Sequence, residues 1–96
     1  MHWSAYEKLL EKWKLLILAT NPQKFEGAVK ITYTRSSVVA PDWDNLAASF
    51  KPIGDALVAC GVIKDDNPSV VVEFIPRWQK AKNNNNLTTT IEIERG

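Results

Sequence analysis

Carboxylate side chains gather in the middle of the chain, where five of its eleven acidic residues fall between residues 39 and 71. Asp42 and Asp44 precede an apolar, helix-like segment, and Asp65 and Asp66 follow it. On an extended segment, side chains two residues apart point to the same side, so Asp42 and Asp44 can face one ion. Mg²⁺ binds oxygen ligands and commonly takes one or two carboxylates together with water and a substrate phosphate. The pattern is therefore compatible with a site for a divalent cation.

Each pair of carboxylates also has a purely structural interpretation. Asp44 or Asn45 can serve as the N-cap of the helix that follows, a position that both residue types favour. Asp65, Asp66 and Asn67 can be turn residues ahead of Pro68. A calcium-binding EF-hand loop is excluded, because its sixth position requires a glycine and Ala47 stands there. Spacing alone leaves metal binding and structural roles both open.

Length and composition predict one globular domain, comprising residues 1–96. The chain is 45% hydrophobic and 24% charged, and its formal net charge is +1. This balance permits a nucleic-acid partner without indicating one, since a strongly basic domain is the usual signature. A single cysteine excludes an internal disulfide and is typical of a reducing compartment. The apolar runs are too short to span a membrane, so we expect a cytoplasmic protein without a membrane partner.

The first half of the chain predicts a helix followed by a strand. Ser4 and Glu7 fit a capping box, and apolar residues at helical spacing continue as far as Ala19. The basic outer face of this helix is expected to be solvated. The segment "AVKITYTR" then alternates between apolar and polar residues, which is typical of a half-buried strand.

The second half predicts another helix and two more strands. A helix with apolar spacing runs from about Leu46 to Gly61, and Pro52 within it either kinks it or opens a separate helix. The segments "SVVVEFIP" and "LTTTIEIER" read as strands, with "RWQKAKNNNN" as a polar loop between them. We expect these two strands to pair as an antiparallel hairpin. The predicted fold is α+β, a small mixed sheet packed with two helices, in the order α-β-α-β-β.

The segment from Asp42 to Val72 resembles the RusA family of Holliday-junction resolvases, often encoded by phages and prophages. It carries "DWDNL", "FK", "DAL" and "CGVIKDDNPSVV" in that order. The family's signature is D-x-D-N-L, a lysine, D-A-L, and then a glycine and a double aspartate before a strand. The resemblance implies a RusA-like fold and an endonuclease acting as a homodimer on four-way or other branched DNA in recombination and repair.

The resemblance also implies the site residues of a crossover-junction endodeoxyribonuclease. Asp42, Asp44 and Asp66 would hold Mg²⁺ or Mn²⁺, and Asp65 is a weaker candidate that could equally cap the turn. Lys51 would place a positive charge near the scissile phosphate. Its structural alternative is an exposed lysine on the surface of a helix.

Other residues receive supporting roles. Lys51 matches the family's lysine when it is counted from Asp55, and Asp55 is expected to support the site or the helix rather than bind metal. Trp43 and Trp78 are expected to pack in the core or at an interface. The candidates for contacts with DNA phosphates are the basic residues of the second half, Lys64, Arg77, Lys80 and Lys82.

One feature departs from the family pattern at the start of the chain. Family members usually begin with a strand ahead of the first helix, whereas this sequence opens directly with "MHWSAYEK". We therefore expect that edge strand to be missing. The alternative function is a truncated, non-catalytic relative that binds DNA junctions or proteins, and a third is an α+β interaction domain whose acidic residues only cap and turn.

Overall fold

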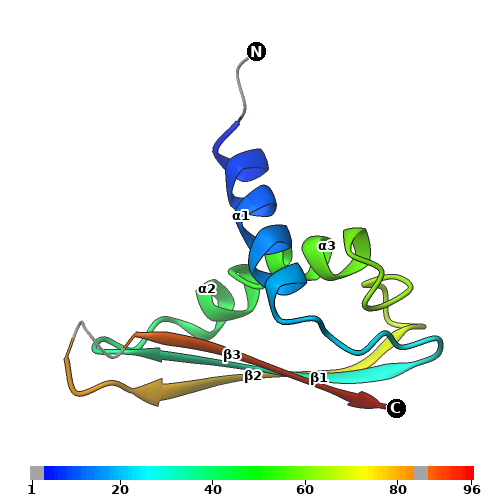
Figure 1. The fold of residues 1–96 in the computed structure, drawn as a ribbon. Coiled ribbons are helices and arrows are strands. Elements are labelled where there is room, and N and C mark those ends of the chain that lie inside the picture. Colours follow the sequence, from blue (N-terminus) through cyan, green and yellow to red (C-terminus); the bar gives the residue numbers. More distant parts are fainter. Residues whose placement is uncertain (1–3, 84–86) are drawn as a thin grey trace.

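Helices cover one face of a small three-stranded sheet, and no helix of the described residues lies against the opposite face (Figure 1). The computed structural model describes residues 4–83 and 87–96. This arrangement confirms the predicted α+β class with a small mixed sheet. The elements in chain order are α1 (Ala5–Ala19), β1 (Val29–Ser37), α2 (Trp43–Ala48), α3 (Lys51–Ala59), β2 (Val71–Lys80) and β3 (Thr88–Arg95).

The predicted capping box opens α1. The Ser4 hydroxyl accepts a hydrogen bond from the Glu7 backbone N–H at 3.0 Å, and the Glu7 carboxylate accepts one from the Ser4 N–H at 3.4 Å. A cap of this kind contributes about 1 kcal/mol to helix stability. The helix packs mainly against α3 and buries Ile17.

Pro52 divides the predicted second helix into two. The helix α2 ends at Ala48, and α3 starts at Lys51 with Pro52 in its first turn. A proline has no N–H to donate to the carbonyl four residues earlier, so the α2 hydrogen-bond ladder cannot continue through it. Of the two alternatives, the separate helix is therefore the correct one, and the element order becomes α-β-α-α-β-β.

Gly61 ends α3 as the sequence predicted. Its φ of +75° lies in the left-handed region that glycine adopts at little cost. The N–H of Val62 donates to the Leu57 carbonyl at 2.9 Å, and the N–H of Gly61 donates to Val58 at 3.0 Å. These two bonds form a Schellman motif, which turns the chain toward the loop that carries Asp66.

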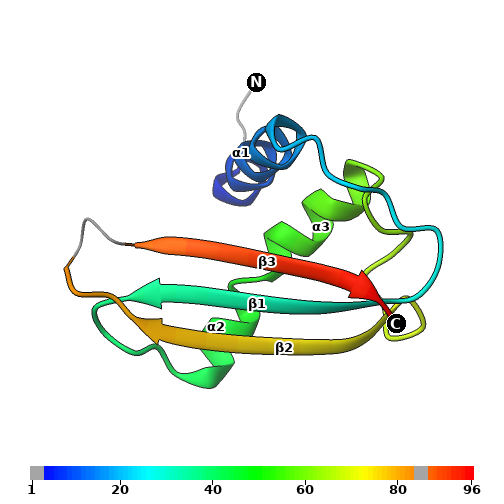
Figure 2. The same cartoon turned by 60° about the horizontal axis from the view of Figure 1, so that its bottom comes forward.

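The central strand β1 forms both sheet contacts, as Figure 2 shows. It runs parallel to β2 and antiparallel to β3, so the predicted hairpin between the last two strands is wrong. The apolar side of β1 explains the difference. Val29, Ile31 and Tyr33 are almost fully buried, and pairing β1 on both edges covers the most apolar strand.

The strand β2 is longer than the sequence predicted. Arg77 and Trp78, assigned to a polar loop, continue the strand opposite Thr34 and Arg35 of β1. The Trp78 indole N–H donates to the Ser37 hydroxyl at 2.8 Å, and its ring packs against the core. This confirms the packing expected for Trp78 and moves Arg77 and Lys80 from a loop onto a strand.

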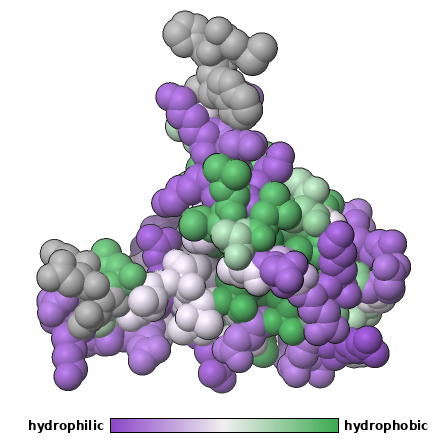
Figure 3. All heavy atoms as spheres, in the orientation of Figure 1, coloured by the Kyte–Doolittle hydropathy of each residue, from purple (hydrophilic) through white to green (hydrophobic). Residues whose placement is uncertain are grey.

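Leucines on the outer side of α1 are unusually exposed. Apolar side chains gather around this helix and just below it, whereas the lower rim of the molecule is mostly hydrophilic (Figure 3). Leu15 and Leu18 are 63% and 58% exposed. Within the described ranges, none of the helices has the length and apolar character needed to cross a membrane.

Leu46 should be the side chain that holds α2 to the domain, since it is 1% exposed and is the buried residue of that helix. Replacing Leu46 by Ala should lower the free energy of unfolding by about 2–5 kcal/mol, because a cavity replaces a buried side chain. Denaturant unfolding measures this change. The matched control is Leu87→Ala at a position that is 54% exposed, which should change it by less than about 0.5 kcal/mol. Equal effects in the two variants would show that α2 is not anchored in this way.

Candidate functional site

One lysine and two aspartates meet where α3 begins. The Lys51 ammonium lies 3.1 Å from Asp55 Oδ1, one helical turn further along, and 3.4 Å from Asp66 Oδ2 in the loop before β2. The Tyr6 hydroxyl of α1 donates a hydrogen bond to Asp55 Oδ2. Three separate segments of the chain thus contribute polar groups to one point.

The loop after α3 is built so that Asp66 points back toward this helix. The carboxylate of Asp65 accepts the Asp66 backbone N–H at 2.7 Å, and the Asn67 side chain accepts the N–H groups of Ser69 and Val70 at 3.0 and 3.2 Å. Asp65 and Asn67 therefore have the turn roles that the structural alternative proposed. The Asp66 carboxylate is left to contact Lys51.

Gly54 leaves room for this approach. A Cβ atom at this position would lie 3.2 Å from a ring carbon of Phe50 and 3.8 Å from Asp66 Oδ2. Contact at 3.2 Å is tighter than ordinary van der Waals packing, so any other residue would displace the Phe50 ring. The glycine thus allows the Phe50 ring and the Asp66 loop to lie close to α3.

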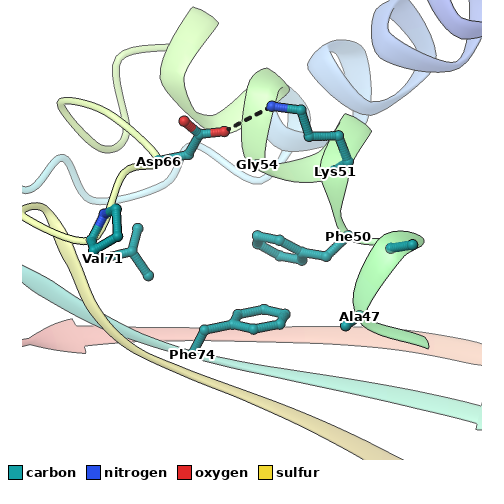
Figure 4. Close-up of a pocket in the computed structure, with 9 residues that line it drawn as sticks. Ala47, Phe50, Lys51, Gly54, Asp66, Val71 and Phe74 are labelled. Atoms are coloured by element: carbon teal, nitrogen blue, oxygen red, sulfur yellow. Dashed lines mark hydrogen bonds and ion pairs between the residues drawn. The ribbon is translucent and has the colours of Figure 1, made fainter. Parts of the chain in front are cut away.

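A pocket of about 500 Å³ lies directly beside the Lys51–Asp66 contact. Figure 4 shows both charged side chains reaching toward each other on one side of it, with the Phe50 and Phe74 rings on the other. The two ring centroids are 4.8 Å apart. Ala47 and Ala48 of α2 complete the wall. The pocket is therefore mainly apolar, with its charge confined to one side.

The two aspartates have opposite pKa shifts. Burial raises the pKa of Asp55, and a hydrogen bond and the negative charge of Asp66 raise it further. For Asp66, burial alone would raise the pKa, but the hydrogen bond and positive charge of Lys51, with help from Asp65 and Asp55, lower it overall. Lys51 therefore keeps Asp66 ionised, whereas Asp55 is the carboxyl that protonates first.

Asp42 and Asp44 lie at the other end of α2. Asp42, rather than Asp44 or Asn45, occupies the N-cap position, and its carboxylate forms no capping hydrogen bond. Asp44 is in the first helical turn, on the same helical face as Ala47 and Ala48, which follow it by three and four residues. Since these two alanines line the pocket, Asp44 lies one turn beyond its wall. Neither carboxylate is used to cap the helix.

The structure does not gather the three predicted metal ligands into one cluster. Across residues 4–83 and 87–96, no group of three or more His, Cys, Asp or Glu side chains is arranged to hold a metal ion. Asp66 contacts Lys51 and Asp55 instead of Asp42 or Asp44. Trp43, between those last two residues, is 66% exposed, so it does not pack in the core, and packing at an interface stays a prediction.

The four predicted DNA contacts are spread widely over the surface, and all are exposed. Lys64 precedes β2 and pairs with Glu26, its Nζ atom lying 3.1 Å from Oε2. Lys80 ends β2, about 30 Å further along a strand of this length, and Lys82 follows it. Arg77 lies opposite Thr34 of β1. Thr34 points to the opposite face from its buried neighbour Tyr33, so Arg77 lies on the helix-free face of the sheet. These four residues do not form one continuous surface.

Sequence reasoning missed Tyr6 as a member of the site and underestimated Asp55. Tyr6 lies on the face of α1 that helical spacing predicts to be apolar, and its hydroxyl meets a carboxylate 49 residues away. Helical periodicity indicates which face of α1 is apolar but not which element that face will meet. The contact therefore has no signal in the sequence.

Comparison of the chain with protein-family models, with curated proteins and with solved structures finds no significant match in any of the three. The functional interpretation therefore depends on the residues between Asp42 and Val72 and on the geometry described above.

Replacing Asp66 by Asn should lower the pKa of Asp55 toward the ordinary aspartate value. Two of the three causes of the raised Asp55 pKa, the hydrogen bond and the negative charge, come from Asp66, and only the effect of burial would remain. A ¹³C NMR titration of the carboxyl groups measures this shift. Asp65→Asn is the control, because Asp65 does not contribute to the pKa of Asp55. An unchanged Asp55 pKa in Asp66→Asn would show that the two carboxylates do not interact.

These shifts also give opposite dependences of folding stability on pH. Asp66, with its lowered pKa, stabilises the fold above the ordinary aspartate pKa, and this contribution is lost as the pH falls. Asp55, with its raised pKa, stabilises the fold at low pH. This contribution is lost as the pH rises through the raised pKa of Asp55 in the folded protein. Lys51→Gln should therefore reduce the loss of stability on acidification, as measured by unfolding at several pH values, because Lys51 lowers the pKa of Asp66 and does not raise that of Asp55.

Proposed function

We propose that the protein is a metal-dependent endonuclease that cleaves branched DNA, resembling the RusA resolvases. The observation that supports this most strongly is the contact between Lys51 and Asp66. The resemblance assigned both residues to catalysis although they are 15 residues apart, and they lie 3.4 Å from each other beside a pocket. Turn and capping roles alone would not require this contact.

Lys51 is suited to stabilise charge on a phosphate. Its side chain is 64% exposed, so the ammonium can reach a phosphate without a large movement of the backbone. Hydrolysis of a phosphodiester adds negative charge to an already anionic group, and a positioned cation lowers the energy of that state. Asp55, hydrogen-bonded by Tyr6 and paired with Lys51, positions the ammonium.

The carboxylates are compatible with Mg²⁺ or Mn²⁺, which require few protein ligands. Asp66 is held in its ionised form, and the Asp42 carboxylate is not used for helix capping. Mg²⁺ commonly binds one or two carboxylates and completes its shell with water and substrate phosphate, so a cluster of three is not needed. Asp66 and one carboxylate at the start of α2, Asp44 or Asp42, would hold the ion, which would activate a water molecule and polarise the phosphate when bound.

A homodimer would suit such an enzyme. A four-way junction has two-fold symmetry, and two symmetric cuts require two copies of the site. The exposed leucines of α1, Leu15, Leu16 and Leu18, offer an apolar surface for a second copy.

The second candidate is a non-catalytic module that binds DNA junctions. It is favoured by one observation, the absence of a three-carboxylate cluster in the described parts of the chain. Both functions place DNA on the same molecule, so binding does not separate them. Cleavage does.

The wild-type protein should introduce paired, symmetric nicks into a labelled synthetic four-way junction with Mg²⁺ or Mn²⁺. Asp66→Asn, Asp44→Asn and Lys51→Gln should each reduce the rate by about a hundredfold or more, as removal of one preorganised charge from a catalytic site does. Rates are measured by denaturing gel electrophoresis. Single, unpaired nicks would argue against the dimer.

Asp65→Asn is the matched control for cleavage, because Asp65 is adjacent to Asp66 and its carboxylate accepts the Asp66 backbone N–H, a bond that an amide oxygen can also accept. It should retain activity within a few fold. A folded wild type that binds the junction and leaves it intact under all these conditions would contradict the nuclease and establish the binding module.

Metal binding can be tested without activity. Mn²⁺ added to the ¹⁵N-labelled protein should broaden the amide signals of Asp66 and Asp44 before those of the remote Glu92 on β3, because the paramagnetic effect falls steeply with distance. Asp66→Asn should weaken the broadening at both positions. Uniform broadening over all exposed carboxylates, or none at all, would contradict a metal site at this pocket.

A further inference from the structure

A second groove lies on the other side of Lys51, between α1 and the beginning of α3. It encloses about 520 Å³ and shares Ala48 and Lys51 with the pocket beside Asp66. One wall belongs to α1 and the opposite wall to the end of β1 and the start of α3. Its lining residues are Tyr6, Leu9, Lys12, Trp13, Tyr33, Arg35, Ala48, Ser49, Lys51 and Pro52.

The charged side chains that line this groove are all cations. Lys12, Arg35 and Lys51 line it, and the lining includes no carboxylate. Lys12 and Arg35 belong to opposite walls, and neither forms an ion pair with another residue of the described ranges. By contrast Lys14, on the same helix as Lys12, is paired with Glu11 at 3.4 Å. The charges of Lys12 and Arg35 are therefore not compensated within the described structure.

Aromatic side chains accompany these cations. The Lys12 ammonium lies 5.8 Å from the centre of the Trp13 ring, and Tyr6 is 41% exposed beside it. Cations interleaved with accessible aromatic rings are typical of surfaces that bind nucleic-acid strands, where phosphates contact the cations and bases stack on the rings. An acidic protein segment would be attracted by the charge but would gain less from the aromatic rings.

We infer that this groove binds the sugar–phosphate backbone of a DNA strand, with one phosphate at Lys12 and a neighbouring phosphate at Arg35. Because the groove and the pocket beside Asp66 share Lys51, a strand bound in the groove would lie next to the candidate catalytic residues. That this strand is the one to be cut rests on the proposed function, whereas the binding itself does not. Contacts of this type position DNA without reading its sequence.

The inference is tested with a fluorescein-labelled four-way junction and fluorescence anisotropy, without divalent cations so that cleavage does not contribute. Lys12→Gln and Arg35→Gln should each weaken binding several-fold. Each should also reduce the slope of log K against log salt concentration by about one, because one phosphate contact is lost. The double variant should reduce it by about two.

The matched controls are Lys8→Gln, one turn earlier on α1, and Arg95→Gln, at the end of β3. Both residues are exposed cations outside the groove lining. They should leave the slope nearly unchanged. Circular dichroism of each variant establishes that it is folded.

Three results would overturn the inference. A folded double variant with wild-type affinity and slope would show that the groove is not used. Equal losses in the controls would show that only overall charge matters. Displacement of the junction by poly-glutamate as readily as by single-stranded DNA would indicate an acidic protein segment as the occupant.

The groove and the nuclease can fail separately. A wild type that binds through Lys12 and Arg35 but never cuts retains the groove and loses the nuclease. A double variant that binds and cuts like wild type retains the nuclease and loses the groove.

Discussion

Pro52 is the constraint on which the candidate site depends. Without an N–H at this position, the helix that begins at Trp43 cannot continue, and a new helix starts at Lys51. The break places Lys51 in the first turn of α3, one turn before Asp55 and within 3.4 Å of Asp66. In one uninterrupted helix, α2 and α3 would share a single axis, and the pocket between Ala47, Phe50 and Asp66 would not have this shape.

The charges at this point contribute little to folding. Lys51 is 64% exposed, and exposed ion pairs generally contribute no more than about 1 kcal/mol to stability. Burial and the neighbouring carboxylate of Asp66 nevertheless raise the pKa of Asp55, whereas for Asp66 burial is outweighed by Lys51, which lowers the pKa. Opposed shifts of neighbouring carboxylates are frequent at functional sites, since there the environment must favour particular protonation states. The charge pattern is therefore consistent with the proposed site at the pocket.

The pocket and the groove share Lys51, but the side chains that line them differ. The pocket beside Asp66 is apolar with acidic and basic groups on one side, whereas the groove under α1 is lined by cations and aromatic rings. A phosphodiester substrate needs both environments, one where its charge is attracted and one where a bond is cleaved. The proposed nuclease and the proposed strand-binding groove are thus two uses of one lysine, approached from opposite sides.

Local patterns in the sequence determined the capped start of α1, the alternation of β1 and the glycine at the end of α3, because each depends only on neighbouring residues. Only the tertiary structure decided that β2 and β3 pair with β1 rather than with each other, since burial of Ile31 on a central strand involves distant segments. The same holds for the site. The residue types between Asp42 and Asp66 indicated which charges could act, but the contact of Tyr6 with Asp55 and the separation of Asp42 from Asp66 follow from how α1, α2 and α3 pack.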